Sequence, residues 1–455
     1  MRSQVKHCRI YVDGVDDIVV AYVPEINKVY VLDSSRRDQI PDSIAVDESQ
    51  IVWEERPPSD ETKPIDLVLL LTSACNLACQ YCYSDAGEAS HIMNASTASR
   101  AVAFVADTAK QIGKKGISIL FHGEGEPTAN WPVLTETVDF AKEYTASLGL
   151  SVRFSIATNG IYGDDKRGYL SQQLHNITLS LDGPRYINDA QRPRRGRSSS
   201  FNTAFESAQY FYSHRSRLNF GIRSTLLPQH IETLPEIVRF IGLHFPSSQL
   251  SVEPVEFVGR YSKHNRHSFE GFAFAYRRAR REAKRHNLRF WYSAVRGPRK
   301  SDFFCGVAGR SMVVGPTGLI SGCSRVSREN HTGARNFIYG KFELGRSAPS
   351  IDPTAKNRLE TYSGTNMLDC QNCIAYTWCR GDCRHIRYMA NGNVLNGVSP
   401  RCREIRTIVL GELMDSAHLS MADKYLQSYY TNEATLPVDS SLTERSSLVQ
   451  LRRTP

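Results

Sequence analysis

The sequence predicts an α/β protein, in which a partial (β/α)6 TIM-type barrel follows a small N-terminal β-rich segment and precedes a C-terminal cysteine-rich domain. Two observations support this fold class. From about residue 64 to residue 260, short apolar runs alternate with helical patterns, as in a parallel sheet covered by helices. Beyond about residue 300 the alternation stops, and seven of the eleven cysteines lie there among Gly, Asn and Arg.

The barrel is predicted from six apolar runs, each short enough to be a buried parallel strand. They lie at residues 65–72, 117–122, 152–158, 177–181, 220–225 and 250–253. Apolar residues recur at helical spacing in the gaps, most clearly over 98–112 and 234–241. Six strand–helix units in succession predict a sheet that curls toward a barrel.

The rest of the chain divides by composition into further regions. Residues 1–63 hold β-branched runs separated by turn residues, which predict a β-rich segment and a possible peptide-docking region. We expect the barrel at 64–260, a helical bridge at 261–300, the cysteine-rich domain at 301–410, and a C-terminal helix with a disordered tail at 411–455.

Composition excludes several classes of protein. With 41% hydrophobic and 23% charged residues, the chain is neither disordered nor collagen-like. It has no apolar run of the roughly 18 residues that a membrane helix needs, and no secretory signal begins it. We therefore expect a cytoplasmic protein, no membrane partner and reduced thiols. Clustered cysteines in odd number then favour metal or iron–sulfur binding over disulfides.

The net charge of +9 is mild for 455 residues. Basic side chains gather at Arg192–Arg197 and at Arg277–Arg285, and the second run has the pattern of a solvated helix face. Neither run is interleaved with aromatic residues and glycine, so we expect no nucleic-acid partner.

Three cysteines follow the first predicted strand, as Cys75-x3-Cys79-x2-Cys82. Three thiolates from one loop can hold three irons of a cubane cluster and leave the fourth iron without a protein ligand. The alternative is zinc, with His91 as the nearest candidate fourth ligand. The alternative to an iron–sulfur enzyme is therefore a zinc-stapled binding module that catalyses no reaction.

The loops after the other predicted strands also carry small and polar residues. In a barrel, the loops at the carboxyl ends of the strands carry the chemistry, so these residues predict one active site. In chain order the loops contain Glu124-Gly125-Glu126-Pro127, Thr158-Asn159-Gly160, Ser180-Leu181-Asp182-Gly183, Arg223-Ser224-Thr225 and Glu253-Pro254.

With Tyr81 before Cys82, the cysteine loop resembles the Cys-x3-Cys-x-aromatic-Cys hallmark of the radical S-adenosylmethionine (SAM) enzymes. The resemblance implies that Cys75, Cys79 and Cys82 bind a catalytic [4Fe-4S] cluster, whose open iron chelates SAM. It also implies SAM contacts at Tyr81 (adenine), Gly125 and Glu126 (amino group), Asn159 and Ser180 (ribose or carboxylate), and Arg192 and Arg223 (carboxylate). One departure is Glu124, where the family has glycine, and it leaves the local backbone conformation in question.

The C-terminal cysteines resemble a SPASM domain. The pattern is Cys305-x12-Gly318-x4-Cys323, then Cys370-x2-Cys373-x5-Cys379-x3-Cys383, then Cys402. This resemblance implies two auxiliary [4Fe-4S] clusters, and so three clusters in all. The distal cluster would bind Cys370, Cys373, Cys379 and Cys402. The proximal cluster would bind Cys305, Cys323 and Cys383, with one open or non-cysteine position, while Cys8 would be a spare buried thiol.

One further residue separates the subclasses of this family. Anaerobic sulfatase-maturating enzymes carry a catalytic Asp directly after the cysteine that Cys323 matches, and here that residue is Ser324. We therefore expect a maturase that crosslinks side chains of a ribosomally synthesised precursor peptide, through a thioether or a C–C or C–O cyclophane. Formylglycine formation and peptide epimerisation are the alternatives. The implied partners are a precursor peptide with its leader and an electron donor of the flavodoxin or ferredoxin type.

Overall fold

The structure is a computed structural model. It describes residues 9–11, 18–23, 28–33, 65–88, 91–256, 258–262, 271–297, 303–309, 311–343, 345–370, 373–416, 426 and 448–450. The chain divides into two compact units. The larger unit comprises Pro57–Ser293 and Cys305–Tyr362, and the smaller comprises Met1–Arg56, Ala294–Phe304 and Ser363–Pro455.

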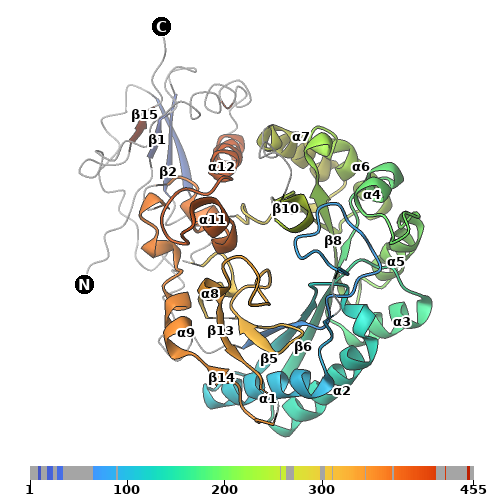
Figure 1. The fold of residues 1–455 in the computed structure, drawn as a ribbon. Coiled ribbons are helices and arrows are strands. Elements are labelled where there is room, and N and C mark those ends of the chain that lie inside the picture. Colours follow the sequence, from blue (N-terminus) through green and yellow to red (C-terminus); the bar gives the residue numbers. More distant parts are fainter. Residues whose placement is uncertain are drawn as a thin grey trace. The chain divides into compact units, whose positions relative to one another are not determined.

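The larger unit is built on one curved sheet whose main part is parallel (Figure 1). Its parallel strands in chain order are β4 (Asp66–Leu70), β5 (Gly116–His122), β6 (Ser151–Thr158), β7 (Asn176–Ser180), β8 (Asn219–Leu226), β9 (Gln249–Pro254) and β10 (Arg289–Tyr292). Each pairs with the next in the chain. The six predicted strands, β4 to β9, are confirmed, because their apolar runs are buried in the sheet.

Helices follow the strands and lie around the outside of the curved sheet (Figure 1). They are α1 (Ala95–Gln111), α2 (Trp131–Ser147), α3 (Asp164–Gln173), α4 (Arg185–Gln191), α5 (Phe201–Ser213), α6 (Leu234–His244) and α7 (Phe272–Arg285). Helix α1 begins at the N-cap Asn94, whose side chain accepts a hydrogen bond from the Thr97 amide at 2.8 Å. Its apolar stripe at helical spacing, Ala98, Val102 and Val105, is fully buried.

The two faces of each strand differ, and this difference positions the site. On β5, Phe121 is fully buried and stacks on Phe154 of β6, with ring centroids 6.3 Å apart. The next residue, His122, is partly exposed, because successive side chains point to opposite faces of a strand. The same alternation leaves Ser180 on β7 and Arg223 on β8 partly exposed. The concave face of the sheet is therefore lined by polar side chains near the carboxyl ends of the strands.

The sheet also extends beyond β4, which the sequence analysis did not predict. Strand β11 (Ser311–Val314) pairs with β4 in parallel, and β12 (Leu319–Ser321), β13 (Ile338–Lys341) and β14 (Ser350–Ile351) follow antiparallel. Two short helices, α8 (Ala334–Phe337) and α9 (Pro353–Glu360), complete this part. Cys323 comes two residues after β12, so the strand pairing attaches this cysteine to the same sheet as Cys75.

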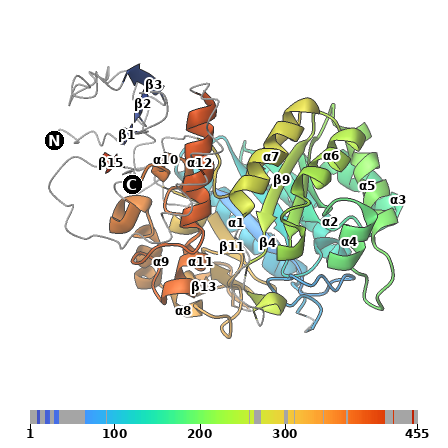
Figure 2. The same ribbon diagram turned by 90° about the horizontal axis from the view of Figure 1, so that it is seen from above.

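The smaller unit contains α10 (Tyr376–Cys379), α11 (Arg384–Asn391) and α12 (Cys402–Ser416) (Figure 2). Cys379 ends α10, Cys383 is the N-cap of α11, and Cys402 begins α12. Strands β2 (Ile18–Val23) and β3 (Lys28–Asp33) pair antiparallel within the N-terminal segment that the sequence predicts to be β-rich. Strand β1 (Arg9–Tyr11) pairs in parallel with β15 (Leu448–Gln450). Cys8 and most of the predicted C-terminal tail lie outside the described residues. Within the described part of the chain, no helix is both long and apolar enough to cross a membrane.

Candidate active site

The cysteine loop lies at the carboxyl end of β4, between that strand and α1. Cys75, Cys79 and Cys82 are each partly exposed. Burial raises the pKa of the Cys79 thiol to about 12, Arg192 acts in the opposite direction, and the neighbouring thiols of Cys82 and Cys75 raise it further. This mutual influence shows that the structure brings the three predicted thiols together.

Backbone pairing on two sides fixes the shape of this loop. On one side, the amides of Gly125 and Glu126 donate to the carbonyls of Thr72 and Ala74, at 2.8 and 2.9 Å. A Cβ at Gly125 would lie 2.0 Å from the Ala74 carbonyl oxygen, so the close approach requires glycine there.

On the other side, the segment 190–195 runs along the loop. The amides of Ala78 and Gln80 donate to the carbonyls of Pro193 and Gln191, at 2.8 and 2.9 Å. The start of the basic run Arg192–Arg197 thus lies directly beside the backbone of the cysteine loop.

Glu126 ties the loop after β5 to the end of β6. Its buried carboxylate accepts hydrogen bonds from the Asn159 amide and the Thr158 hydroxyl, both at 2.8 Å, and from Thr128. Burial raises the pKa of Glu126, while these donors act in the opposite direction. The Asn159 side chain in turn donates to Asn76 at 2.7 Å and lies 3.8 Å from the Cys75 sulfur. The structure therefore gathers three of the predicted SAM contacts, Gly125, Glu126 and Asn159, beside the cysteine loop.

Tyr81 and Arg192 belong to a buried network that also includes Asp182. The Tyr81 hydroxyl donates to Asp182 Oδ2 at 2.6 Å and accepts a hydrogen bond from Arg192 Nη1. Gln191 Nε2 donates to the same carboxylate oxygen at 2.8 Å. Burial raises the pKa of Asp182 and the Arg192 guanidinium lowers it. Asp182 lies in a loop that the sequence predicts at the active site, directly after the predicted strand at 177–181, but the sequence assigned it no specific role.

Ser180 and Arg223 lie side by side on the concave face, because they are register partners across β7 and β8. The Arg223 side chain is 40% exposed, and its guanidinium lies 3.8 Å from the carboxylate of Glu253 on β9. Arg192, by contrast, is almost fully buried in the Tyr81 network. Of the two arginines predicted to meet a carboxylate, Arg223 is the one whose charge faces accessible space.

Two further arginines, which the sequence analysis did not single out as site residues, bond to the backbone of the cysteine loop. Arg195 Nε donates to the Cys75 carbonyl at 3.0 Å, and Arg260 Nη1 donates to the Cys79 carbonyl at 3.1 Å. Both also donate to the carbonyl of Ala86. Gly259 makes the approach of Arg260 possible, because it has a φ of 56° and a Cβ there would lie 2.2 Å from the Cys82 carbonyl oxygen.

Glu124, the departure from the family motif, is buried and has a defined partner. Its carboxylate accepts a hydrogen bond from the Ser327 hydroxyl and lies 3.1 Å from Arg328 Nε. Arg328 also donates to the Ser84 carbonyl at 3.4 Å. Glu124 is not among the residues with a positive φ, so its backbone conformation does not require glycine. Its side chain instead joins the loop after β5 to the segment that follows Cys323.

In the smaller unit the structure brings together Cys370, Cys373, Cys379 and Cys402. Burial raises the pKa of Cys379 well above its ordinary value, and the thiols of the other three cysteines contribute to the shift. Four arginines of the same region are fully buried: Arg380, Arg384, Arg387 and Arg401. Arg387 Nη1 lies 3.9 Å from the Cys370 sulfur. Buried positive charge beside four thiols suits a negatively charged, thiolate-bound group.

The remaining three cysteines are divided between the units. Cys305 and Cys323 belong to the larger unit and Cys383 to the smaller, so their assignment to one cluster stays a prediction. Among the described residues, no three Cys, His, Asp or Glu side chains are placed to hold a single metal ion. In a cubane cluster, by contrast, the cysteine ligands are distributed over separate irons.

Residues 69–241 match the model of the Radical SAM superfamily. Two curated relatives are 27% identical over 177 and 181 residues: an uncharacterized protein of Methanocaldococcus jannaschii and the Fe-coproporphyrin III synthase of Methanosarcina barkeri. These segments cover 38% and 39% of this chain, and 57% and 41% of the two relatives. The chain thus spans about half the length of the curated relatives it matches.

Two solved structures share the fold. A structure of anSMEcpe with bound AdoMet has a TM-score of 0.58 at 18% identity, and the match covers 80% of this chain and 98% of that one. Streptococcus suis SuiB bound to the precursor peptide SuiA has a TM-score of 0.52 at 18% identity, with 75% and 76% covered. Residues 69–241 thus match a radical SAM domain, and the two solved structures share the fold of this chain.

Proposed function

We propose that this protein is a radical SAM enzyme that crosslinks side chains of a ribosomally synthesised precursor peptide. The observation that carries the proposal is the loop of Cys75, Cys79 and Cys82, whose thiols converge at the rim of a radical SAM domain. A second group of four cysteines lies in a separate compact unit, as a SPASM domain would require. Two structures that share the fold were solved with peptides, anSMEcpe with the Cp18Cys peptide and SuiB with SuiA.

The cysteine loop fits the catalytic [4Fe-4S] cluster on three counts. Its thiols converge, its backbone is fixed by hydrogen bonds on both sides, and the carbonyls of Cys75 and Cys79 are bonded by guanidinium groups. When bound, the cluster and SAM supply a 5'-deoxyadenosyl radical. The share of the chain is to hold SAM and to place one C–H bond of the substrate against it.

The SAM contacts that we propose lie at or after the carboxyl ends of five strands, except Arg192, which follows helix α4. They are Tyr81, Gly125, Glu126, Asn159, Ser180, Arg192 and Arg223. Because Arg192 already bonds to Tyr81, we assign Arg192 to orienting that ring and Arg223 to the carboxylate of SAM. The Glu126 carboxylate accepts several hydrogen bonds within the chain, so we assign it to fixing the loop whose backbone faces the amino group.

The distal auxiliary cluster is supported by the four buried arginines beside its proposed ligands. Burying a guanidinium is unfavourable unless negative charge accompanies it. Asp382 and Asp369 supply negative charge through ion pairs with Arg401 and Arg387. Arg387 and Arg384 also act on the charge of Cys370, as they would on a thiolate-bound cluster. We therefore propose two auxiliary clusters, the distal one on Cys370, Cys373, Cys379 and Cys402 and the proximal one on Cys305, Cys323 and Cys383.

Three alternatives remain to be separated from crosslinking. Formylglycine formation is disfavoured by Ser324, because a hydroxyl cannot replace the aspartate base of sulfatase maturases. Peptide epimerisation needs no second bond and leaves the mass of the peptide unchanged. A porphyrin substrate is suggested only by the name of one relative, and that match covers 39% of this chain.

The partners are also proposals. We propose an acidic flavodoxin or ferredoxin as the electron donor, a cytoplasmic location, and the N-terminal β-rich segment as the docking region for the leader. The basic run 192–197 contributes less to leader docking than its composition indicates. Arg192 and Arg194 are hydrogen-bonded within the larger unit, and Arg195 bonds to the cysteine loop.

Co-expression with the short reading frames that neighbour the gene tests this function. Mass spectrometry should show that one encoded peptide loses two hydrogens, and fragmentation should locate the new bond between two side chains. The Cys79→Ala variant should leave the peptide unmodified. An unchanged mass with a D-residue would instead establish epimerisation, and no modified peptide in any pairing would contradict the proposal.

A further inference from the structure

His122 is a histidine of the larger unit to which neither the sequence motifs nor the family comparison assigns a role. It is the last residue of β5 and faces the concave side of the sheet, since Phe121 before it is buried on the other side. Arg223 on β8 is close enough to influence the charge of His122. Because β6 and β7 separate these two strands in the sheet, the two side chains face each other across the concave surface.

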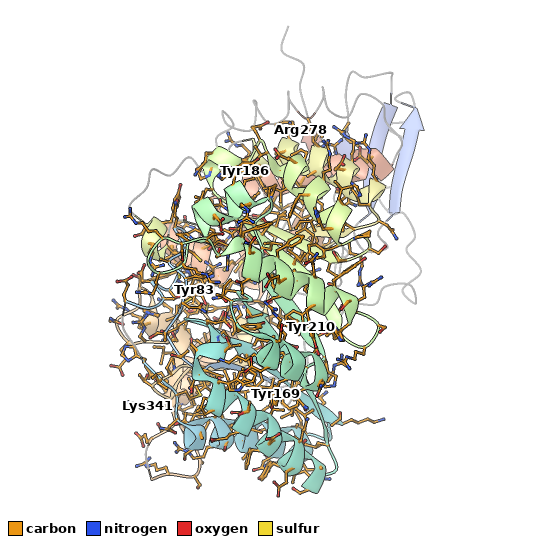
Figure 3. The ribbon with its side chains drawn as sticks, turned by 90° about the vertical axis from the view of Figure 1, so that its right-hand side faces the viewer. Tyr83, Tyr169, Tyr186, Tyr210, Arg278 and Lys341 are labelled. Carbon is orange, nitrogen blue, oxygen red and sulfur yellow. The ribbon has the colours of Figure 1, made fainter. Side chains whose placement is uncertain are left out.

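The hydrogen bonds around His122 define its tautomer. Nδ1 lies 3.1 Å from the carbonyl oxygen of Gly123, and the hydroxyl of Tyr83, labelled in Figure 3, donates to the same oxygen. A carbonyl oxygen only accepts, so Nδ1 must carry the hydrogen. Nε2 then holds a lone pair, and none of the described residues forms a hydrogen bond with it. The partly exposed ring thus carries an unprotonated nitrogen.

Burial, together with nearby positive charge, keeps the ring neutral. Burial lowers the pKa of His122 to about 4, the guanidinium groups of Arg223 and Arg325 contribute, and the hydrogen bond to Gly123 acts in the opposite direction. Arg223 pairs with Glu253, and Arg325 with Glu256. Tyr83, the remaining titratable neighbour, has a pKa that burial raises well above its ordinary value. At neutral pH the imidazole is therefore an available proton acceptor.

The residue at position 324 indicates which catalytic group His122 could replace. In sulfatase-maturating relatives this position carries the catalytic aspartate, as the sequence resemblance implies. The next residue, Arg325, lies 5.7 Å above the Tyr83 ring and acts on the charge of His122. The segment that carries Ser324 in place of the carboxylate is therefore close enough to the His122 ring to act on its charge.

We propose that His122 is the base that accepts the proton that the peptide loses when the crosslink forms. This inference rests on the proposed function. Forming a bond between two side chains breaks one C–H bond and one further X–H bond, where X is carbon, oxygen or sulfur. The first hydrogen would leave as an atom, to the radical that SAM supplies when it is bound. The second would leave as a proton to Nε2 of His122 and as an electron, for which a bound auxiliary iron–sulfur cluster would be the acceptor.

A weak base is sufficient for this step. The species that releases the proton has been oxidised by one electron, which makes its X–H bond strongly acidic. A carboxylate bound by Arg223 would also offset a positive charge near the ring and raise the pKa of His122 once the site is filled. The low pKa of the open site therefore keeps the base unprotonated until it is needed.

The test compares His122→Gln with a matched control, His175→Gln. His175 precedes the amino end of β7, at the opposite end of the strands, and burial lowers its pKa too. With SAM and dithionite alone, both reconstituted variants should form 5'-deoxyadenosine within about twofold of the unmodified enzyme. With the co-expressed precursor peptide, His122→Gln should lower crosslinked product by about 10²-fold or more, whereas His175→Gln should not.

Nitrogen-15 NMR of the histidine-labelled, reconstituted protein supplies a readout independent of activity. The signal that disappears in His122→Gln should report a neutral ring protonated at Nδ1 at pH 7. Equal crosslinking by His122→Gln and the unmodified enzyme would overturn the inference, as would a ring charged at pH 7 or a loss of SAM cleavage. If the unmodified enzyme crosslinks no peptide, the proposed function fails instead, and this inference fails with it.

Discussion

Two arginine side chains, Arg195 and Arg260, hold the backbone of the cysteine loop by hydrogen bonds. From the sequence, Arg195 resembles any residue of a solvated basic run, and Arg260 stands in a loop without a recognisable pattern. In the structure both guanidinium groups donate to carbonyls of the loop, so they hold its backbone where thiolates would carry a cluster. Their positive charge also lies beside the proposed cluster, and nearby charge and hydrogen bonds set its reduction potential.

Replacing Arg260 with alanine should weaken cluster binding and make the reduction potential more negative. The variant loses hydrogen bonds to Cys79 and Ala86 and an ion pair to Glu88, which together stabilise the loop by about 1–3 kcal/mol. It also removes a positive charge that favours the reduced, more negative cluster. Iron analysis and a redox titration followed by electron paramagnetic resonance measure the two effects.

Arg197→Ala is the matched control for Arg260→Ala, because Arg197 is exposed in the same wall of the loop and its amide bonds only to Arg194. It should leave both iron content and potential unchanged. If Arg260→Ala behaves like this control, the arginine has no role in holding or tuning the cluster.

Among the helices and strands, the elements themselves could be predicted from local sequence patterns, but pairing between elements far apart in the chain could not. The strands from β4 to β9 could be predicted because each is an apolar run with its own boundaries. The pairing of β11 with β4 could not, since the paired residues are more than 240 positions apart and share no local periodicity. The contact of Glu124 with Ser327 and Arg328 was hidden for the same reason.

This contact should measurably couple two elements, the loop after β5 and the segment after Cys323. A double-mutant cycle with Glu124→Ala and Arg328→Ala should give a coupling energy of about 1–3 kcal/mol in chemical unfolding, because the carboxylate is buried. The exposed pair Glu343 and Arg346 is the control, for which we expect about 0.5 kcal/mol or less. Equal coupling energies for the two pairs would show that the Glu124 contact does not join the elements.

For the whole molecule, the sequence predicted the fold class and the residues that carry the chemistry better than it predicted their contacts. Spacing alone grouped Cys75, Cys79 and Cys82, because a cluster needs its ligands at short, defined separations, whereas the group of four C-terminal cysteines was implied by the resemblance to a SPASM domain. The prediction that the strand-end loops form one site, together with the family resemblance, placed Gly125 and Asn159 near Cys75. The role of Asp182 in the Tyr81 network and the position of His122 were not predicted, because an aspartate or histidine at a strand end has no pattern until its neighbours in space are known.

The central claim is that the loop of Cys75, Cys79 and Cys82 binds a cluster that cleaves SAM. Anaerobic reconstitution followed by iron and zinc analysis, with 5'-deoxyadenosine measured after addition of SAM and dithionite, tests it most directly. We predict about twelve irons per chain for three cubane clusters, formation of 5'-deoxyadenosine, and loss of about four irons and of all cleavage in Cys79→Ala. Zinc in place of iron, without cleavage of SAM, would contradict the account and establish a zinc-stapled binding module.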